Sequence, residues 1–150
     1  MKHFRLLLPF LLLAGMITPA ARATLGEAAQ SVQNDQVRMR GTLRVSQQQA
    51  YTVHELHAPY GTVVREYVSP SSAKVFAVTW QGPRIPDLQQ LLGPYFDQYT
   101  RAVQSRRAHG PLLIELPGLV VQSTGHQRSF TGRAYLPQEV PSGVRAHSLQ

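Results

Sequence analysis

Apolar and polar side chains alternate with a period of two over much of the region from residue 37 to residue 81. Such alternation is typical of half-buried strands, and the proline-containing separators at 58–61 and 69–73 are typical of turns. We predict a strand beginning at Val37 after a short helix at 26–34. We also predict an antiparallel meander of three runs rich in β-branched and aromatic residues: 51–57, 62–68 and 74–81.

Run 74–81 carries few polar side chains on either face. Regular alternation would place Phe76, Val78 and Trp80 on one face, and Val75, Ala77 and Thr79 on the other. A strand that is apolar on both faces is typical of the middle of a sheet. We therefore predict that this run is a central strand.

After residue 86 the apolar period changes to the three-and-four spacing of one helical face. Its positions are Leu88, Leu91, Leu92, Tyr95, Phe96, Tyr99, Ala102 and Val103. Asp87 stands where an N-cap is expected, and Pro94 removes a backbone hydrogen bond inside the pattern. Because the apolar face continues across the proline, we predict one kinked or broken amphipathic helix that ends near Arg106 and Arg107.

Three further apolar runs follow at 112–116, 119–123 and 129–136, with short turns between them. Together the patterns predict an α+β fold, in which a mostly antiparallel sheet of about six strands packs on the single helix. We expect one domain over residues 24–136. Residues 137–150 contain two prolines and have no period, so an extended C-terminal arm or a frayed tail is expected there.

The first 23 residues have the three parts of a cleavable secretory signal peptide. Lys2 and Arg5 give a positive start, the stretch 6–17 is apolar and uncharged, and small residues end the segment. The stretch is shorter than the roughly 20 residues that span a bilayer. We expect cleavage between Ala23 and Thr24, no membrane span afterwards, and export by the general secretory route to the periplasm or beyond.

Removal of residues 1–23 lowers the formal net charge from +7 to +4, and the remaining positive charge is almost entirely arginine spread along the chain. A nucleic-acid-binding domain would show a basic stripe with interleaved aromatic residues, so no nucleic-acid partner is expected. The chain contains no cysteine. Disulfide bonds, thiol catalysis and a lipid-anchored product are therefore excluded.

Several segments carry a resemblance to a known family. They include Tyr51-Thr-Val-His-Glu, Gly61-Thr-Val-Val-Arg-Glu-Tyr and the stretches 74–83, 86–93, 117–121 and 132–137. This chain resembles an uncharacterised family of exported proteins of Gram-negative bacteria, the domain of unknown function 2844. The resemblance implies a location in the cell envelope, and it brings no activity, ligand or catalytic residue with it.

Histidine and glutamate come together at residues 54–57, in the order His-Glu-Leu-His. The metalloprotease zinc motif needs two histidines four residues apart on a helix. His54 and His57 are three apart on a predicted strand, so they fall on opposite faces of the sheet. We expect no metal site from this motif.

The pairing of this strand with the next one decides what its polar side chains contact. If the hairpin register puts Glu55 opposite Arg65, then His54 lies opposite Glu66. We interpret these residues as cross-strand pairs that specify the hairpin. The alternative is an acid–base or metal site that uses His54, Glu55 or His57.

Two more histidines, His109 and His126, lie in predicted loops. Either could share a site with His57 only if the fold brings them together, and we expect neither a metal nor a cofactor. Ser123 lies near His126 without an aspartate partner in the sequence, and no Gly-x-Ser-x-Gly motif occurs. A serine hydrolase is therefore not indicated.

Trp80 and Arg84 lie at the end of the predicted central strand, where an aromatic ring and a guanidinium group could hold a sugar or an anion. The competing interpretation is that Trp80 belongs to the core, since it continues the face of Val78.

Without a recognised catalytic constellation, we expect a non-catalytic binding or assembly module. Its partner would be another component of the cell envelope, a protein or a glycan. The alternatives are a small hydrolase using His54, Glu55, His57 or His126, and a soluble carrier with a ligand between helix and sheet.

Overall fold

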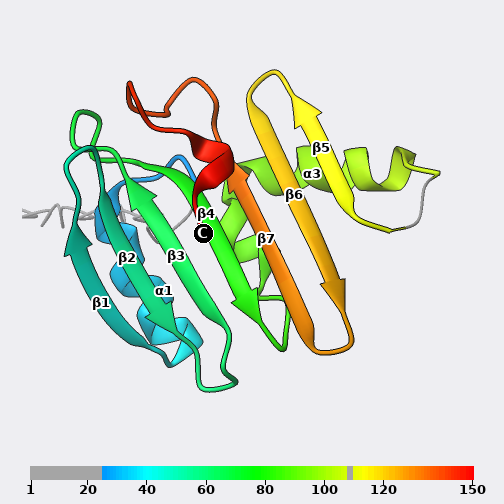
Figure 1. Ribbon diagram of the computed structural model, residues 1–150, viewed down its shortest axis with the longest axis horizontal. Coiled ribbons are helices and arrows are strands. Elements are labelled where there is room, and N and C mark those ends of the chain that lie inside the picture. The colour runs from blue at the N-terminus through cyan, green and yellow to red at the C-terminus, as the bar shows by residue number, and fades with distance from the viewer. Residues whose placement is uncertain (1–24, 108–109) are drawn as a thin grey trace, which may run out of the picture.

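The computed structural model of the chain describes residues 25–107 and 110–150, so the predicted signal peptide, its cleavage position and His109 lie outside the described residues. Seven strands form one antiparallel sheet in the order β1-β2-β3-β4-β7-β6-β5 (Figure 1). They are β1 (Thr42–Gln47), β2 (Thr52–His57), β3 (Val63–Val68), β4 (Val75–Gly82), β5 (Leu112–Leu116), β6 (Leu119–His126) and β7 (Ser129–Tyr135). The predicted α+β fold is confirmed, and the sheet has seven strands where about six were expected.

Strands β2, β3 and β4 form the predicted antiparallel meander, and β4 is the middle strand of the seven. In the first hairpin Glu55 lies opposite Arg65 and His54 lies opposite Glu66. This is the register under which cross-strand pairs were expected, although the sequence did not decide it. It puts Glu55 and His57 on one face of the sheet and His54 on the other.

A β-bulge in β4 makes one part of the predicted alternation wrong. Tyr67 pairs with Ala77, whereas the next residue, Val68, pairs with Val75, so Phe76 is an extra residue in the ladder. As a result Phe76 packs on the same side as Ala77, and Val75 packs on the opposite side. The sequence pattern had placed these two neighbouring residues the other way round.

Residues 37–41, predicted to start the first strand, belong instead to a helix and its end. A 3-10 turn (Ala29–Ser31) leads into α1 (Val32–Met39), so the short helix expected at 26–34 lies further along the chain. The side chain of Val37 is 77% exposed, whereas Val32 and Met39, seven residues apart on one helical face, pack in the core. The helix ends at Arg40, whose φ of 50° is left-handed.

The predicted kinked helix is confirmed. It consists of α2 (Leu88–Leu92) and α3 (Phe96–Ser105), joined by a 3-10 turn (Gly93–Tyr95) that contains Pro94. The carboxylate of Asp87 accepts a hydrogen bond from the backbone N–H of Gln90 at 3.1 Å, as expected of an N-cap.

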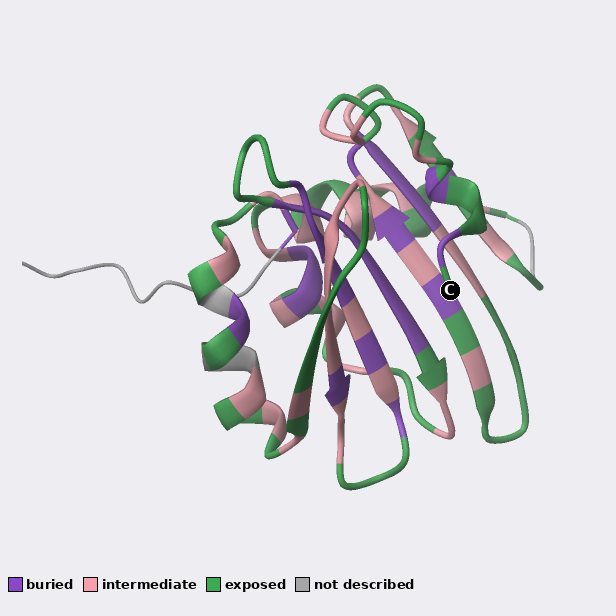
Figure 2. Cartoon of the chain, turned by 60° about the vertical axis from the view of Figure 1, so that its left-hand side comes forward, coloured by how far each residue is buried: buried purple, intermediate pink, exposed green. Residues whose placement is uncertain are grey.

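All three α-helices cover the same face of the sheet, which we call the inner face (Figures 1 and 2). The main core lies between the helices and this inner face of the sheet, and Trp80 is its largest fully buried side chain. Other members are Leu25, Val32, Leu56, Val64, Val78, Leu91, Leu92, Leu119, Val121 and Ala134. Figure 2 shows burial concentrated in the central strands, whereas the edge strand β1 is mostly exposed.

Residues 137–150, expected to be an extended arm or a frayed tail, fold back over the opposite, outer face of the sheet (Figure 1). They end in a 3-10 turn (Ala146–Ser148), and Ala146 and Leu149 are buried in a second cluster with Tyr67 and Phe76. The Tyr67 hydroxyl donates a hydrogen bond to the backbone carbonyl of Gln150 at 2.6 Å. This segment covers only part of the outer face.

Candidate functional site

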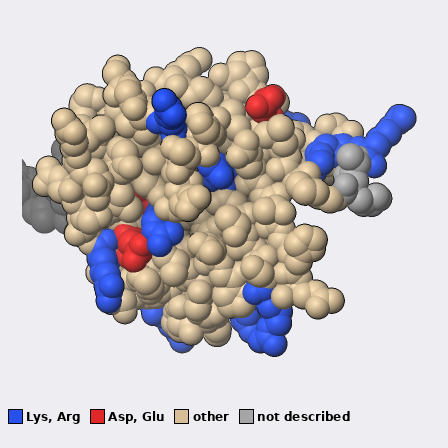
Figure 3. Space-filling view, viewed as in Figure 1, with Lys and Arg blue, Asp and Glu red and all other residues tan. Residues whose placement is uncertain are grey.

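A row of polar side chains crosses the outer face from strand to strand. The pairing register aligns one residue from each of six neighbouring strands, in the order Arg44, Glu55, Arg65, Thr79, Arg133 and Gln122. We call this set the polar row. It holds three arginines and one glutamate. Figure 3 views this face and shows basic side chains in separate places with few acidic ones.

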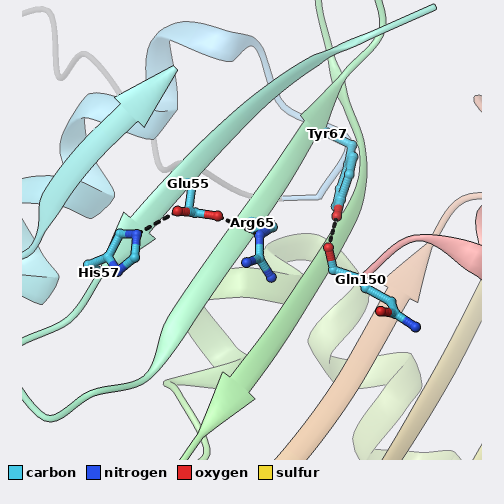
Figure 4. A network of polar contacts seen from close by, with 5 residues as sticks. All are labelled: Glu55, His57, Arg65, Tyr67 and Gln150. Atoms are coloured by element: carbon cyan, nitrogen blue, oxygen red, sulfur yellow. Dashed lines mark hydrogen bonds and ion pairs between the residues drawn. The ribbon is translucent and has the colours of Figure 1, made fainter. Parts of the chain in front are cut away.

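The part of the row nearest the β1 edge is an ordered network (Figure 4). One carboxylate oxygen of Glu55 lies 2.5 Å from Nε2 of His57, and the other accepts a hydrogen bond from Nε of Arg65 at 2.6 Å. The hydrogen bond with His57 is the main reason why the pKa of Glu55 lies below its ordinary value, and Arg65 adds to the effect. Both carboxylate oxygens are thus engaged, which leaves Glu55 poorly suited to act as a base.

Arg65 and Arg133 flank Thr79, which lies between them on the central strand. Since neighbouring strands are about 4.8 Å apart, the two arginine backbones are separated by about 10 Å. The short threonine side chain between them leaves a pocket of about 180 Å³, which Gln81 and Thr131 also line. We call it the outer pocket. Leu149 and Gln150 of the C-terminal segment close one side of it.

The outer pocket contains hydrogen-bonding capacity that the protein itself does not use. Thr79 is only 4% exposed, and its buried hydroxyl lies beside that of Tyr67, which donates a hydrogen bond to the Gln150 carbonyl. The unused donors belong to the two arginines. Arg65 uses only Nε within the described chain, and Arg133 donates from one terminal nitrogen to the carbonyl of His147. Guanidinium donors therefore remain for a ligand at the pocket.

The three described histidines that were proposed from the sequence, His54, His57 and His126, do not come together. His54 points to the inner face, where burial lowers its pKa, and His57 lies on the outer face. His126 is at the exposed end of β6, with β3, β4 and β7 between it and β2. Among the described residues no cluster of three or more histidine, aspartate or glutamate side chains could hold a metal ion.

Trp80 and Arg84 lie apart as well. The indole of Trp80 is buried in the inner core, at 1% exposure, so the core interpretation holds for this ring. Arg84 is exposed beyond the strand, and its guanidinium stacks over the Tyr60 ring at 4.5 Å from the ring centroid. The Thr62 hydroxyl donates to the Arg84 carbonyl at 2.9 Å and fixes the backbone there.

No sequence pattern singles out Arg65, Thr79 and Arg133 as one site. The hairpin register already put Arg65 on the face of Glu55. What was missing is the pairing of β4 with β7, two strands that are separated by α2, α3, β5 and β6 along the chain. Without that pairing Arg133 could not be placed beside Thr79.

In the part of the chain that the structure describes, no helix is both long and apolar enough to cross a membrane. No curated protein and no solved structure matches the sequence. A family model does match, over residues 21–149, which is most of the chain. The protein therefore belongs to the family described as Protein of unknown function (DUF2844).

Proposed function

We propose that this protein is a non-catalytic binding module of the bacterial cell envelope and that it holds an acidic glycan in the outer pocket. The observation that carries the proposal is the arrangement of Arg65 and Arg133 on either side of Thr79, in the lining of one pocket. Guanidinium groups bind carboxylates or sulfates, and threonine and glutamine side chains bind sugar hydroxyls.

The shape and charge of the outer face favour a glycan as the ligand. The polar row continues on both sides of the pocket, and a second polar line beside it contains His57, Gln81 and Thr131. An extended chain of sugar units could lie across several strands and use these donors and acceptors. The excess of arginine over glutamate in the row favours an acidic chain over a neutral one.

The hydrolase alternative has less support from the geometry. A hydrolytic site needs a base and a nucleophile or metal within hydrogen-bond reach of one another. His54 and His57 lie on opposite faces, and Glu55 has both oxygens engaged by His57 and Arg65. A protein that only binds its ligand does not need these side chains to lie close to one another.

The location in the envelope belongs to the same proposal and rests on the N-terminal sequence and the resemblance to exported proteins. We expect the protein to be found in the periplasmic fraction, or outside the cell, with Thr24 as its first residue. Mass spectrometry of the N-terminal peptide after fractionation tests this. Recovery of the unprocessed chain from the cytoplasm would contradict it.

The ligand proposal can be tested by titration calorimetry of the mature protein with oligogalacturonate, an acidic sugar chain, and with its methyl ester, in which the carboxylates are neutral. We expect the acidic form to bind at least tenfold more tightly, because hydrogen bonds between charged partners contribute about 1.5–3 kcal/mol. Arg133→Ala should weaken binding of the acidic form roughly tenfold or more.

Arg101→Ala is the matched control, since Arg101 is an exposed arginine on α3, on the inner side of the sheet. It should leave the affinity unchanged. Equal affinity for the acidic and esterified chains, or equal loss with the Arg133 and Arg101 variants, would overturn the proposal. Failure of both sugar chains to bind, together with specific capture of an envelope protein, would favour a protein partner instead.

A further inference from the structure

A second cavity lies on the other side of the sheet, at the end where the β2–β3 turn and the loop after β4 meet the end of α1. It has a volume of about 370 Å³, within the range of small-molecule sites. We call it the basal groove. Its lining includes Arg38, Arg40 and Arg84 together with the apolar side chains of Met39, Val64 and Ile85. It shares none of its lining with the outer pocket.

Three arginines surround the basal groove: Arg38 and Arg40 at the end of α1, and Arg84 in the loop after β4. None of them forms an ion pair with a carboxylate of the described residues. Asp87, the one acidic side chain in the lining, accepts the backbone N–H of Gln90 as the cap of α2. Among the described side chains, the groove therefore presents more basic than acidic groups to a ligand.

One of these arginines, Arg84, is held in place by local structure. Its guanidinium stacks on the Tyr60 ring, and its backbone carbonyl accepts a hydrogen bond from the Thr62 hydroxyl. The Arg84 guanidinium is thus partly ordered before any ligand binds, which lowers the entropy lost on binding.

The rest of the lining is largely apolar. Met39 and Val64 belong to or pack against the inner core, and Ile85 is 48% exposed. Besides Tyr60, the lining has one other residue with a hydroxyl group, Thr62. That hydroxyl already donates a hydrogen bond to the backbone carbonyl of Arg84. A sugar would therefore find few partners here, whereas an alkyl chain would find an apolar surface next to guanidinium groups.

We propose that the basal groove binds a small amphipathic carboxylate, an alkyl chain that ends in a carboxylate group. The carboxylate would pair with Arg84 and with Arg38 or Arg40, and the alkyl chain would cover Met39, Val64 and Ile85. This goes beyond the glycan-binding function and does not depend on it, because the two cavities lie on opposite faces of the sheet.

The test is calorimetric titration of the mature protein with decanoate, decanol and acetate below their aggregation concentrations. We expect decanoate to bind at least tenfold more tightly than either of the others. Decanol lacks the charge that the arginines recognise, and acetate lacks the chain that the apolar surface recognises. If decanol or acetate binds as tightly as decanoate, or if decanoate does not bind, the proposal is overturned.

Two variants locate the site. Arg84→Gln should weaken decanoate binding roughly tenfold by removing the charge, and Ile85→Ser should weaken it several-fold by removing apolar contact. Both side chains are exposed, so neither change should unfold the domain. The Arg101→Ala control should bind decanoate like the wild type. Unchanged binding by both groove variants, or binding to anionic vesicles without binding to monomeric decanoate, would contradict a groove for single molecules.

Discussion

The indole ring of Trp80 occupies the space that a side chain at Gly132 would need. The two residues pair across β4 and β7, and a Cβ built on Gly132 would lie 2.2 Å from a ring carbon of Trp80. The contact is closer than any real Cβ makes, and both the large ring and the rigid backbone would have to move. Gly132 is therefore required by the core and not by a turn.

Gly132→Ala should destabilise the fold by about 1–3 kcal/mol, the usual cost of overpacking a core. Urea unfolding followed by Trp80 fluorescence measures this directly. Gly118→Ala is the matched control, because nothing lies within 4 Å of a Cβ at that position. Equal stability of the two variants would mean that Trp80 can move aside without cost.

Tyr67→Phe should loosen the C-terminal segment from the outer face. The change removes the hydrogen bond from the hydroxyl to the Gln150 carbonyl. It leaves the ring in the second hydrophobic cluster, on the outer face of the sheet. We expect a loss of about 1 kcal/mol in unfolding free energy and faster amide exchange in residues 146–150. Tyr60→Phe serves as the control, because the Tyr60 side chain is 65% exposed and its hydroxyl has no hydrogen bond among the described residues. Unchanged exchange in the Tyr67 variant would show that apolar contacts alone hold the segment.

Glu55 should make the stability of the hairpin depend on acid pH. Its pKa in the folded protein lies below its ordinary value of about 4.3, chiefly because of the hydrogen bond with His57. The stabilisation is therefore complete above pH 4.3 and is lost as the pH falls through the lower, folded-state pKa. Glu55→Gln should cost about 0.5–1 kcal/mol at pH 7, and the difference from the wild type should shrink below pH 4.

Glu115→Gln is the comparison for this measurement, since Glu115 is exposed on β5 and has no ion pair among the described residues. Thermal unfolding of the three proteins between pH 3 and pH 7 gives the curves. A constant difference between wild type and Glu55→Gln across this range would show that the network does not depend on the charge of Glu55.

His54 should titrate below the ordinary histidine value of about 6.5, because burial disfavours its charged form. Its neutral form is favoured in the fold, so stability should decline as the pH falls from 6.5 toward the lower pKa and then level off. NMR titration of the imidazole resonances measures the folded pKa, and the same resonance in urea gives the ordinary value. A folded pKa above 6.5 would mean that Glu66, directly opposite on β3, holds a proton on His54.

The sequence predicted best where several signals agreed. The hairpin of β2 and β3 combines clear alternation with a short turn, and these predicted the two strands and their antiparallel pairing. The register, which buries Leu56 and Val64 on the same face, was left open. Asp87 and the apolar positions after it likewise predicted the kinked helix with its cap.

Prediction failed where a local pattern was ambiguous or a partner was distant in the chain. Val37 is an exposed apolar residue of the short helix α1. Together with Met39 it produced the alternating pattern that is typical of a strand. The apolar residues of the C-terminal segment have no regular spacing; they are Val140, Val144, Ala146 and Leu149. They pack against the aromatic rings of Tyr67 and Phe76 on the outer face of the sheet, and no local pattern in the segment predicts this contact. The outer pocket needed the long-range pairing of β4 with β7, which no local pattern contains.

The bulge in β4 lets one strand supply neighbouring residues to both faces of the sheet. Phe76 is the extra residue of the ladder, and it gives the cluster on the outer face its most deeply buried side chain while Val75 and Val78 keep their places in the inner core. The C-terminal segment therefore depends for its main apolar contact on a single residue that the ladder with β3 does not need.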